Sequence, residues 1–197
     1  MKSLILTGVL DPSDLAAIIK ECEPYFEKQF RQGEIVSGLM PNIRTSGVRF
    51  IETGIPETIQ IGFELLHRTI GDYDFECYNY PDIQFLKYPA GGFYNWHYDH
   101  MKKNDSDMER AMSLSITLND DFKGGGLDIK DGYDLLAAPD QKGAFAVFSA
   151  FHQHRAVPVT LGERRAITMW FPSDPKTVQR IRARVREGSM DSPPKSS

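Results

Sequence analysis

The sequence predicts a mainly β fold with flanking helices (α+β), arranged as a double-stranded β-helix, or jelly roll. Hydrophobic residues recur at helical spacing in two segments of the first eighty residues. From Asp82 to Phe171 the period changes to two, glycine-rich turns separate the segments, and no stretch has a helical pattern. Helical spacing returns after Ser173. Short strands with helices on either side are typical of a jelly roll whose sheet is covered by helices on one face.

The chain of 197 residues is long enough for one domain with a sizeable core. We expect this domain to span residues 1–188, with helical support in 1–81, the jelly-roll core in 82–172 and a last helix in 173–188. Residues 189–197 are rich in serine and proline and are predicted to form a flexible tail.

The N-terminal elements follow from helix-start residues and apolar spacing. Residues 4–9 are predicted to form a strand. Asp11-Pro12 is typical of a helix start, and the apolar stripe behind it predicts a helix over 12–23. A second helix should begin at Pro56 and end before Gly71, a residue type that commonly terminates helices.

The stretch 110–119 is the clearest strand. Its even positions are apolar and its odd positions are small and polar: Met112, Leu114, Ile116 and Leu118 against Ser113, Ser115 and Thr117. Side chains alternate between the two faces of a strand, so the apolar face should meet the helices. The polar face should line a cavity that admits a charged ligand. Further apolar strands are predicted over 143–149 and 164–171, with another extended segment over 155–160.

The last helix combines an apolar side with many arginines. Ser173 or Asp174 is the expected N-cap, and Pro175 follows it. The apolar side has Val178, Ile181 and Val185, and the arginines are Arg180, Arg182, Arg184 and Arg186. A solvated helix face is the ordinary interpretation of such a run, and a docking surface for an acidic partner stays open.

His97 and Asp99 are two residues apart, so on one strand their side chains point to the same face, with Tyr98 pointing away. His154 follows after a predicted strand, and Arg164 stands in the next one. Two imidazoles and one carboxylate form the facial triad of non-haem Fe(II) oxygenases, which leaves coordination positions open for a chelating cosubstrate and dioxygen. Arg164 is a candidate to anchor a dicarboxylate cosubstrate.

Other residues compete for these roles. His152 shares the parity of His154 and is an alternative for the third ligand. His100 should point away from the metal, and His67 should be exposed on its helix. Tyr94 and Trp96 differ in parity from the triad, and either pack beneath the sheet or form part of a substrate wall.

At this point the sequence resembles the prolyl 4-hydroxylase-like branch of the 2-oxoglutarate and Fe(II)-dependent dioxygenases. The resemblance covers roughly residues 82–172. It rests on Tyr88-Pro-Ala-Gly-Gly-Phe-Tyr94-Asn-Trp-His97-Tyr-Asp99, on Arg110-Ala-Met-Ser-Leu-Ser-Ile-Thr-Leu-Asn119, on Gly124-Gly125-Gly126, and on the run from His154 to Arg164 with Trp170. An upstream segment that begins Arg44-Thr-Ser also resembles an Arg-x-Ser segment of these enzymes. Arg164 stands where family members often have lysine.

The resemblance implies catalytic iron bound by His97, Asp99 and His154, and 2-oxoglutarate bound through its distal carboxylate by Arg164 and Tyr88. It implies O2 as the oxidant, with ascorbate as a supporting reductant. The reaction would decarboxylate 2-oxoglutarate to succinate and CO2 and hydroxylate a prolyl or other peptidyl side chain. A free amino acid or small metabolite stays open as substrate, and a non-catalytic metal-binding jelly-roll module is the alternative from another class.

Composition and charge limit the classes of binding partner that we expect. A net charge of −4 disfavours a surface that coats nucleic acid, as does Trp170 at a position where nucleic-acid demethylases of this chemistry usually have a second arginine. No segment approaches the roughly 20 apolar residues of a membrane span, and the first residues lack the apolar length of a signal peptide. Two cysteines, Cys22 and Cys77, do not make a disulfide scaffold. We therefore expect free thiols, a cytoplasmic location and no nucleic-acid or membrane partner.

Overall fold

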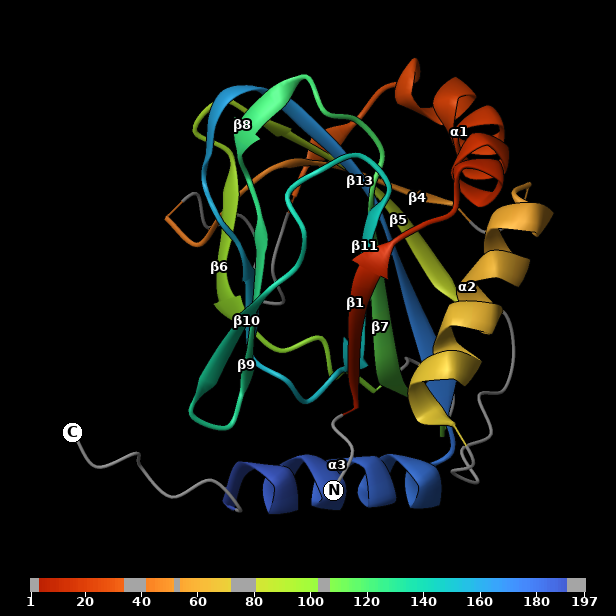
Figure 1. Ribbon diagram of the computed structural model, residues 1–197, viewed down its shortest axis with the longest axis vertical. Coiled ribbons are helices and arrows are strands. Elements are labelled where there is room, and N and C mark those ends of the chain that lie inside the picture. Colours follow the sequence, from red (N-terminus) through yellow and green to blue (C-terminus); the bar gives the residue numbers. More distant parts are fainter. Residues whose placement is uncertain (1–3, 34–41, 52–53, 72–80, 103–106, 191–197) are drawn as a thin grey trace.

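Two antiparallel β-sheets face one another, and helices lie outside the larger sheet and across one end of the molecule (Figure 1). The computed structural model describes residues 4–33, 42–51, 54–71, 81–102 and 107–190. The larger sheet has the strand order β1-β11-β7-β13-β5-β4-β2, with β8 paired to β13, and the smaller sheet has the order β10-β9-β12-β6-β3. This arrangement confirms the predicted mainly β jelly roll with flanking helices.

The larger sheet consists of β1 (Ile5–Val9), β2 (Arg31–Gln32), β4 (Gly47–Ile51), β5 (Asp82–Pro89), β7 (Glu109–Thr117), β8 (Phe122–Gly124), β11 (Ala144–Ser149) and β13 (Val159–Ser173). The smaller sheet consists of β3 (Arg44–Thr45), β6 (Phe93–His97), β9 (Leu127–Asp131), β10 (Asp134–Ala137) and β12 (His154–Ala156). Strand β13 is longer than predicted, because Gly162 has a φ of 76° and lets the strand turn from β8 to β5 without ending.

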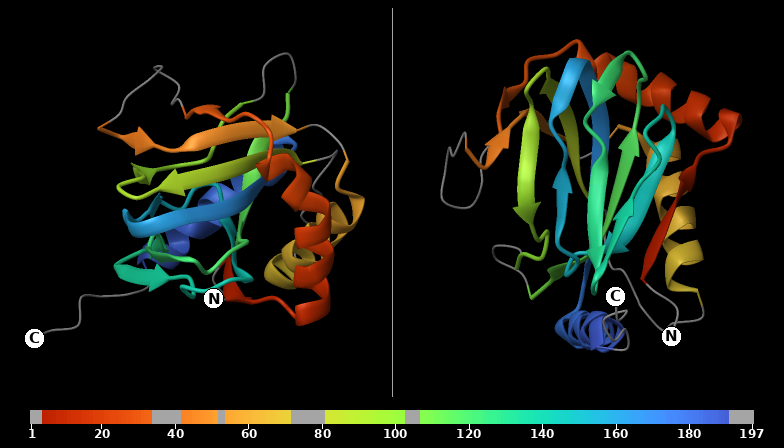
Figure 2. Two further views of the ribbon diagram at one scale, coloured as in Figure 1. Left: turned by 90° about the horizontal axis from the view of Figure 1, so that it is seen from above. Right: turned by 60° about the vertical axis from the view of Figure 1, so that its left-hand side comes forward.

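Helices α1 (Pro12–Phe26) and α2 (Pro56–Ile70) pack against one another and lie outside the larger sheet, and α3 (Pro175–Met190) crosses one end of the molecule (Figure 2). Helix α1 continues past its predicted end at residue 23, because Tyr25 stacks on Phe85 of β5 and Phe26 packs edge-on against the same ring. Helix α2 ends as predicted, with Gly71 at a φ of 60°.

Asp174 is the N-cap of α3, and its Oδ1 accepts hydrogen bonds from the backbone N–H groups of Lys176 and Thr177 at 2.8 and 3.2 Å. The helix continues to Met190, so Ser189 and Met190 of the predicted tail are helical. Residues 191–197 lie outside the described residues.

The main core lies between the helices and the larger sheet. Strand β7 contributes its even positions there, as predicted: Met112, Leu114, Ile116 and, just after the strand, Leu118 are buried in this core. Cys22 of α1 is a free thiol in the same core, and burial raises its pKa to about 12. Cys77 lies outside the described residues. Within the part of the chain described, no helix has the length and apolar content to cross a membrane.

Candidate metal centre

Two neighbouring strands of the smaller sheet bring the predicted ligands together. β12 pairs with β6, and in this register His154 lies directly opposite His97. The Nε2 atoms of His97 and His154 lie 3.6 and 3.3 Å from the two carboxylate oxygens of Asp99. One ligand atom from each of the three residues lies within 4.8 Å of the others. The sequence prediction of a His-Asp-His cluster therefore corresponds to a cluster in space.

Asp99 is held by a loop rather than by the strand that carries His97. β6 ends at His97, and the backbone N–H groups of Asp99 and His100 both donate to the carbonyl of Ala150, at 3.2 and 3.1 Å. Tyr98 has 59% of its surface exposed but also borders the cavity that contains the cluster, so the predicted orientation away from the site is not confirmed. The two backbone hydrogen bonds fix Asp99 although it lies beyond the sheet.

The hydrogen bonds around the cluster orient its donor atoms. The Nδ1 of His97 lies 2.7 Å from the carbonyl oxygen of Asn95, and that of His154 lies 3.0 Å from the carbonyl oxygen of His152. With Nδ1–H donating to a carbonyl, each ring presents the lone pair of Nε2 to the cluster. The Ser113 hydroxyl donates to Oδ2 of Asp99 at 2.8 Å. These contacts are the outer hydrogen bonds that metal-binding histidines and carboxylates usually make.

The electrostatics of the cluster favour an ionised carboxylate at Asp99 and act in opposite directions on the two histidines. Burial alone would raise the pKa of Asp99, but the His154 and His97 rings outweigh it and hold this pKa well below its usual value. Burial lowers the pKa of His97. For His154 burial acts in the same direction, but the Asp99 charge exceeds it and raises the pKa. Two nitrogen donors and one carboxylate are a donor set that suits Fe(II).

A cavity of about 540 Å³ between the two sheets contains the cluster. Arg164 and Tyr88 also line it. They form a cross-strand pair of β13 and β5, and the Arg164 guanidinium carbon lies 5.7 Å from the centre of the Tyr88 ring. Both side chains are buried, and burial raises the pKa of Tyr88. The two predicted cosubstrate contacts thus share one cavity with the metal ligands.

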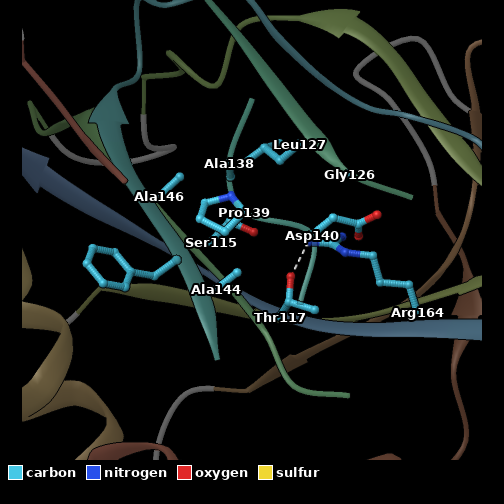
Figure 3. Close-up of a pocket in the computed structure, with 11 residues that line it drawn as sticks. Ser115, Thr117, Gly126, Leu127, Ala138, Pro139, Asp140, Ala144, Ala146 and Arg164 are labelled. Atoms are coloured by element: carbon cyan, nitrogen blue, oxygen red, sulfur yellow. Dashed lines mark hydrogen bonds between the residues drawn. The ribbon is translucent and has the colours of Figure 1, made fainter. Parts of the chain in front are cut away.

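Arg164 is a buried cation whose direct hydrogen-bond partner among the described residues is the neutral Thr117. Its Nη2 donates to the Thr117 hydroxyl at 2.9 Å, and Figure 3 shows this bond beside a second, small pocket that includes Asp140. Burial lowers the pKa of Arg164, against the opposing effects of Tyr88 and Asp140. No carboxylate lies within ion-pair distance of Arg164 in the described part of the chain. A guanidinium in this state suits an anionic ligand, because burying a charge is unfavourable unless it is paired.

The competing histidines lie elsewhere. His152 is buried with its Nε2 3.7 Å from Asp131, and His100 binds Glu109 at 2.6 Å while its side chain borders the cavity. His67 is exposed on α2, as predicted. Arg110 lines the cavity and lies 3.4 Å from Asp82.

Tyr94 faces the cavity and stacks on His97, with ring centres 3.5 Å apart. Strict alternation would place these residues on opposite faces, because they are three positions apart. A bulge accounts for the difference: His154 and Ala156 of β12 lie opposite His97 and Tyr94, so β6 has one extra residue. Trp96 contacts the cations of Lys130 and Arg155, at 4.3 and 4.7 Å from its ring.

Arg44 was not assigned a role from the sequence, yet it lines the cavity. Its Nε donates to Ser46 at 2.8 Å and its Nη2 donates to Gln84 at 3.0 Å. The guanidinium also lies 4.5 Å from the ring of Tyr94. The signals that could have found this group are the Arg-x-Ser spacing and a glutamine at an inward position of an apolar strand.

Fold and site together define a jelly-roll protein with a two-histidine, one-carboxylate centre. Residues 83–172 match the family model of the 2OG-Fe(II) oxygenase superfamily. A PKHD-type hydroxylase of Shewanella sp. (strain ANA-3) is 28% identical over 150 residues, which are 72% of this chain and 66% of the relative. Over these residues the chain is similar to the 2-oxoglutarate and Fe(II)-dependent oxygenase superfamily, which confirms the resemblance found in the sequence. The match spans slightly less than two thirds of that relative.

Solved structures share the fold. A prolyl-4-hydroxylase of Pseudomonas putida superposes with a TM-score of 0.68 at 21% identity, covering 86% of this chain and 92% of that one. A prolyl hydroxylase of Trichoplax adhaerens, in complex with a peptide fragment of the oxygen degradation domain of hypoxia inducible factor, gives a TM-score of 0.66 at 19% identity. That match covers 91% of this chain and 84% of the other.

Proposed function

We propose that this protein is an Fe(II)- and 2-oxoglutarate-dependent dioxygenase that hydroxylates a prolyl or other peptidyl side chain. The observation that carries the proposal is a single cavity into which His97, Asp99, His154 and the buried Arg164 all open. Three of these side chains suit a ferrous ion, and the fourth suits a carboxylate. A site for a structural metal would have no reason to leave coordination positions open beside a buried cation.

Each residue of the site would have a distinct role in binding or orientation. His97, Asp99 and His154 would hold Fe(II), which together with 2-oxoglutarate and O2 supplies the oxidation that forms succinate, CO2 and the hydroxylated product. Arg164 would bind the distal carboxylate of 2-oxoglutarate through charge-assisted hydrogen bonds. Tyr88 would donate a hydrogen bond from its hydroxyl group to the same carboxylate, since burial disfavours the phenolate. Ser113 would keep Asp99 in its orientation.

The carboxylate of Asp99 also bears on the outcome of the reaction. A halogenase of this chemistry needs the carboxylate position vacated for halide. With Asp99 beside both histidines, transfer of a hydroxyl group is the outcome that the ligand set favours. Ascorbate as a supporting reductant and a cytoplasmic location belong to the same proposal.

A peptidyl substrate is supported by the names of similar proteins, which are PKHD-type and prolyl hydroxylases, one of them in complex with a peptide. The cavity also opens past exposed Tyr98 and Met101, so an extended chain has access to it. A free amino acid or small metabolite is the alternative substrate, and a non-catalytic metal-binding module is the alternative function.

The test is release of succinate from 2-oxoglutarate by purified protein with Fe(II). His97→Ala and Asp99→Ala should reduce the rate by on the order of 100-fold or more, because the metal loses a ligand. His67→Ala, on the exposed side of α2, is the matched control and should keep the wild-type rate. Equal release by the three variants would refute the assignment. Incubation with peptide pools and with free amino acids, followed by a search for the mass gain of one oxygen atom, separates the substrate classes.

A further inference from the structure

We propose that an acidic polypeptide segment docks on a basic surface that leads from the cavity mouth to helix α3; this deepens the proposed function and rests on it. We call this surface the basic strip, and define it by Arg31 and Lys102 at the mouth, His100 and Phe151 in the middle, and Arg182 and Arg186 on α3. The acidic segment would flank the hydroxylated residue and bring it to the metal.

The cavity itself has a strong excess of positive charge. Its described lining contains the cations Arg31, Arg44, Lys102, Arg110 and Arg164, and the only carboxylate in that lining is Asp99. Bound metal would neutralise Asp99. One cation, Arg164, is taken up by the cosubstrate in the proposed function, and Arg31 and Lys102 are the exposed cations of this lining that a further anion can reach.

The cations near the mouth differ in how strongly they are paired within the protein. Arg110 lies 3.4 Å from Asp82. Arg31 is exposed and lies over the ring of Phe50, 5.6 Å from its centre. Lys102 approaches Asp107 at 3.9 Å, with most of both side chains exposed. An exposed pair at that distance contributes little, so Lys102 is available to an incoming carboxylate.

Aromatic contacts connect the mouth to α3. His100, which borders the cavity, stacks on Phe151 with ring centres 4.5 Å apart. On the other side, the guanidinium of Arg182 lies 5.6 Å from the centre of the Phe151 ring. The surface from the cavity to the helix is therefore continuous at the level of side-chain contacts.

Helix α3 presents a basic outer face. Val178 and Ile181 anchor it in the core, and it contacts β7, β9 and β11 at one end of the two sheets (Figure 1). Its charged residues are Lys176, Arg180, Arg182, Arg184, Arg186 and Glu187. Arg182 and Arg186 are four residues apart and both exposed, so they lie on one face of the helix. This helix thus concentrates positive charge within a chain whose net charge is −4.

The properties of this surface favour a polypeptide over a nucleic acid. Apolar side chains, Tyr98 at 59% exposure and Met101 at 43%, lie among the cations of the mouth. They suit a polypeptide that carries both apolar and acidic side chains. A nucleic acid backbone, in contrast, would bind mainly through the charge of its phosphates. The net negative charge of the whole chain also opposes the approach of a polyanion as large as a duplex.

The experiment measures binding without turnover. The full chain is loaded anaerobically with Fe(II) and 2-oxoglutarate, and fluorescent proline-centred peptides are titrated by anisotropy. In one peptide glutamates flank the proline, and in its partner glutamines replace them. We expect the glutamate peptide to bind at least about tenfold more tightly at low salt and to lose this advantage at high salt. The double variant Arg182→Gln/Arg186→Gln should weaken it by about two- to fivefold per arginine and leave the glutamine peptide unchanged.

The control is Lys20→Gln on the exposed side of α1, which should bind both peptides like wild type. Equal affinity for the two peptides, no effect of the double variant, or tighter binding of a single-stranded oligonucleotide of equal charge would overturn the docking proposal. Because O2 is absent, the binding experiment does not depend on whether the protein catalyses hydroxylation. With O2 present, the double variant should raise KM for the glutamate peptide by the same factor and leave kcat unchanged. Charge-dependent binding together with no succinate release would instead refute the hydroxylase assignment and leave the docking proposal intact.

Discussion

The two faces of the larger sheet are built from the same strands but serve opposite purposes. On β7, Leu114 and Ile116 point into the core beneath α1 and α2. On the other face Ser115 lines the cavity, and Ser113 and Thr117 hydrogen-bond to Asp99 and Arg164. β13 repeats the pattern, with Ile167 in the core and Arg164 in the cavity. Apolar burial on one face stabilises the sheet, and this leaves the other face free to hold polar groups whose burial is unfavourable for folding. Stability and function are therefore separated by residue parity.

Substitution on the core face should have the largest effect on stability. Leu114→Ala is expected to lower the free energy of unfolding by about 3–5 kcal/mol, since it opens a cavity in a fully buried cluster. Ser115→Ala, its neighbour on the other face, should change it by less than about 1 kcal/mol. Urea denaturation of both variants measures the difference. Similar losses in the two variants would show that the faces are not separable.

Arg164→Met should weaken cosubstrate binding without lowering the stability of the fold. We expect KM for 2-oxoglutarate to rise by roughly 100-fold, because the distal carboxylate loses a buried cationic partner. The free energy of unfolding should stay the same or increase, since a buried charge without a close ion pair in the described residues is removed. Succinate kinetics and urea denaturation together check this. An unfolding loss as large as that of Leu114→Ala, with KM unchanged, would make Arg164 a structural residue.

The separation by parity is also the reason why so much was predictable. Alternation along 110–119 identified both the core face and the cavity face, and the positions of the helices followed from Pro12, Pro56 and Gly71. The cluster of His97, Asp99 and His154 followed from residue type and spacing. In each case the physical cause is local: a repeat of two or of about 3.6 residues, or a residue that begins or ends a helix.

What could not be predicted depends on irregular backbone or on long-range register. The bulge in β6 puts Tyr94 on the same face as His97, and nothing in the local sequence marks the extra residue. Asp99 lies outside its strand because Ala150, far away in the chain, accepts its backbone hydrogen bond. The contact of Arg44 with Gln84 requires β3 and β5 to belong to opposing sheets. Counting parity fails where the strand itself is interrupted.

A smaller effect is expected where the cavity face supports the metal indirectly. Ser113→Ala removes the hydroxyl that donates to Asp99, and should weaken Fe(II) binding by about tenfold. Ser115→Ala is the matched control, because its hydroxyl makes no hydrogen bond to the three ligands among the residues described. Anaerobic metal titration compares the two. If both serines gave the same small change, the orientation of Asp99 would not depend on its hydrogen bond with Ser113.

The smallest expected effect concerns the group behind Arg164. Thr117→Val keeps the shape of the side chain and removes the acceptor of the Arg164 hydrogen bond seen in Figure 3. The guanidinium then keeps its charge but loses one constraint on its direction, so KM for 2-oxoglutarate should rise by about two- to tenfold with kcat nearly unchanged. Thr117→Ser, which retains the hydroxyl, should restore most of the affinity. If the serine variant were as impaired as the valine variant, packing of the methyl group rather than the hydrogen bond would orient Arg164, and the cavity face would depend on apolar contact in the same way as the core face.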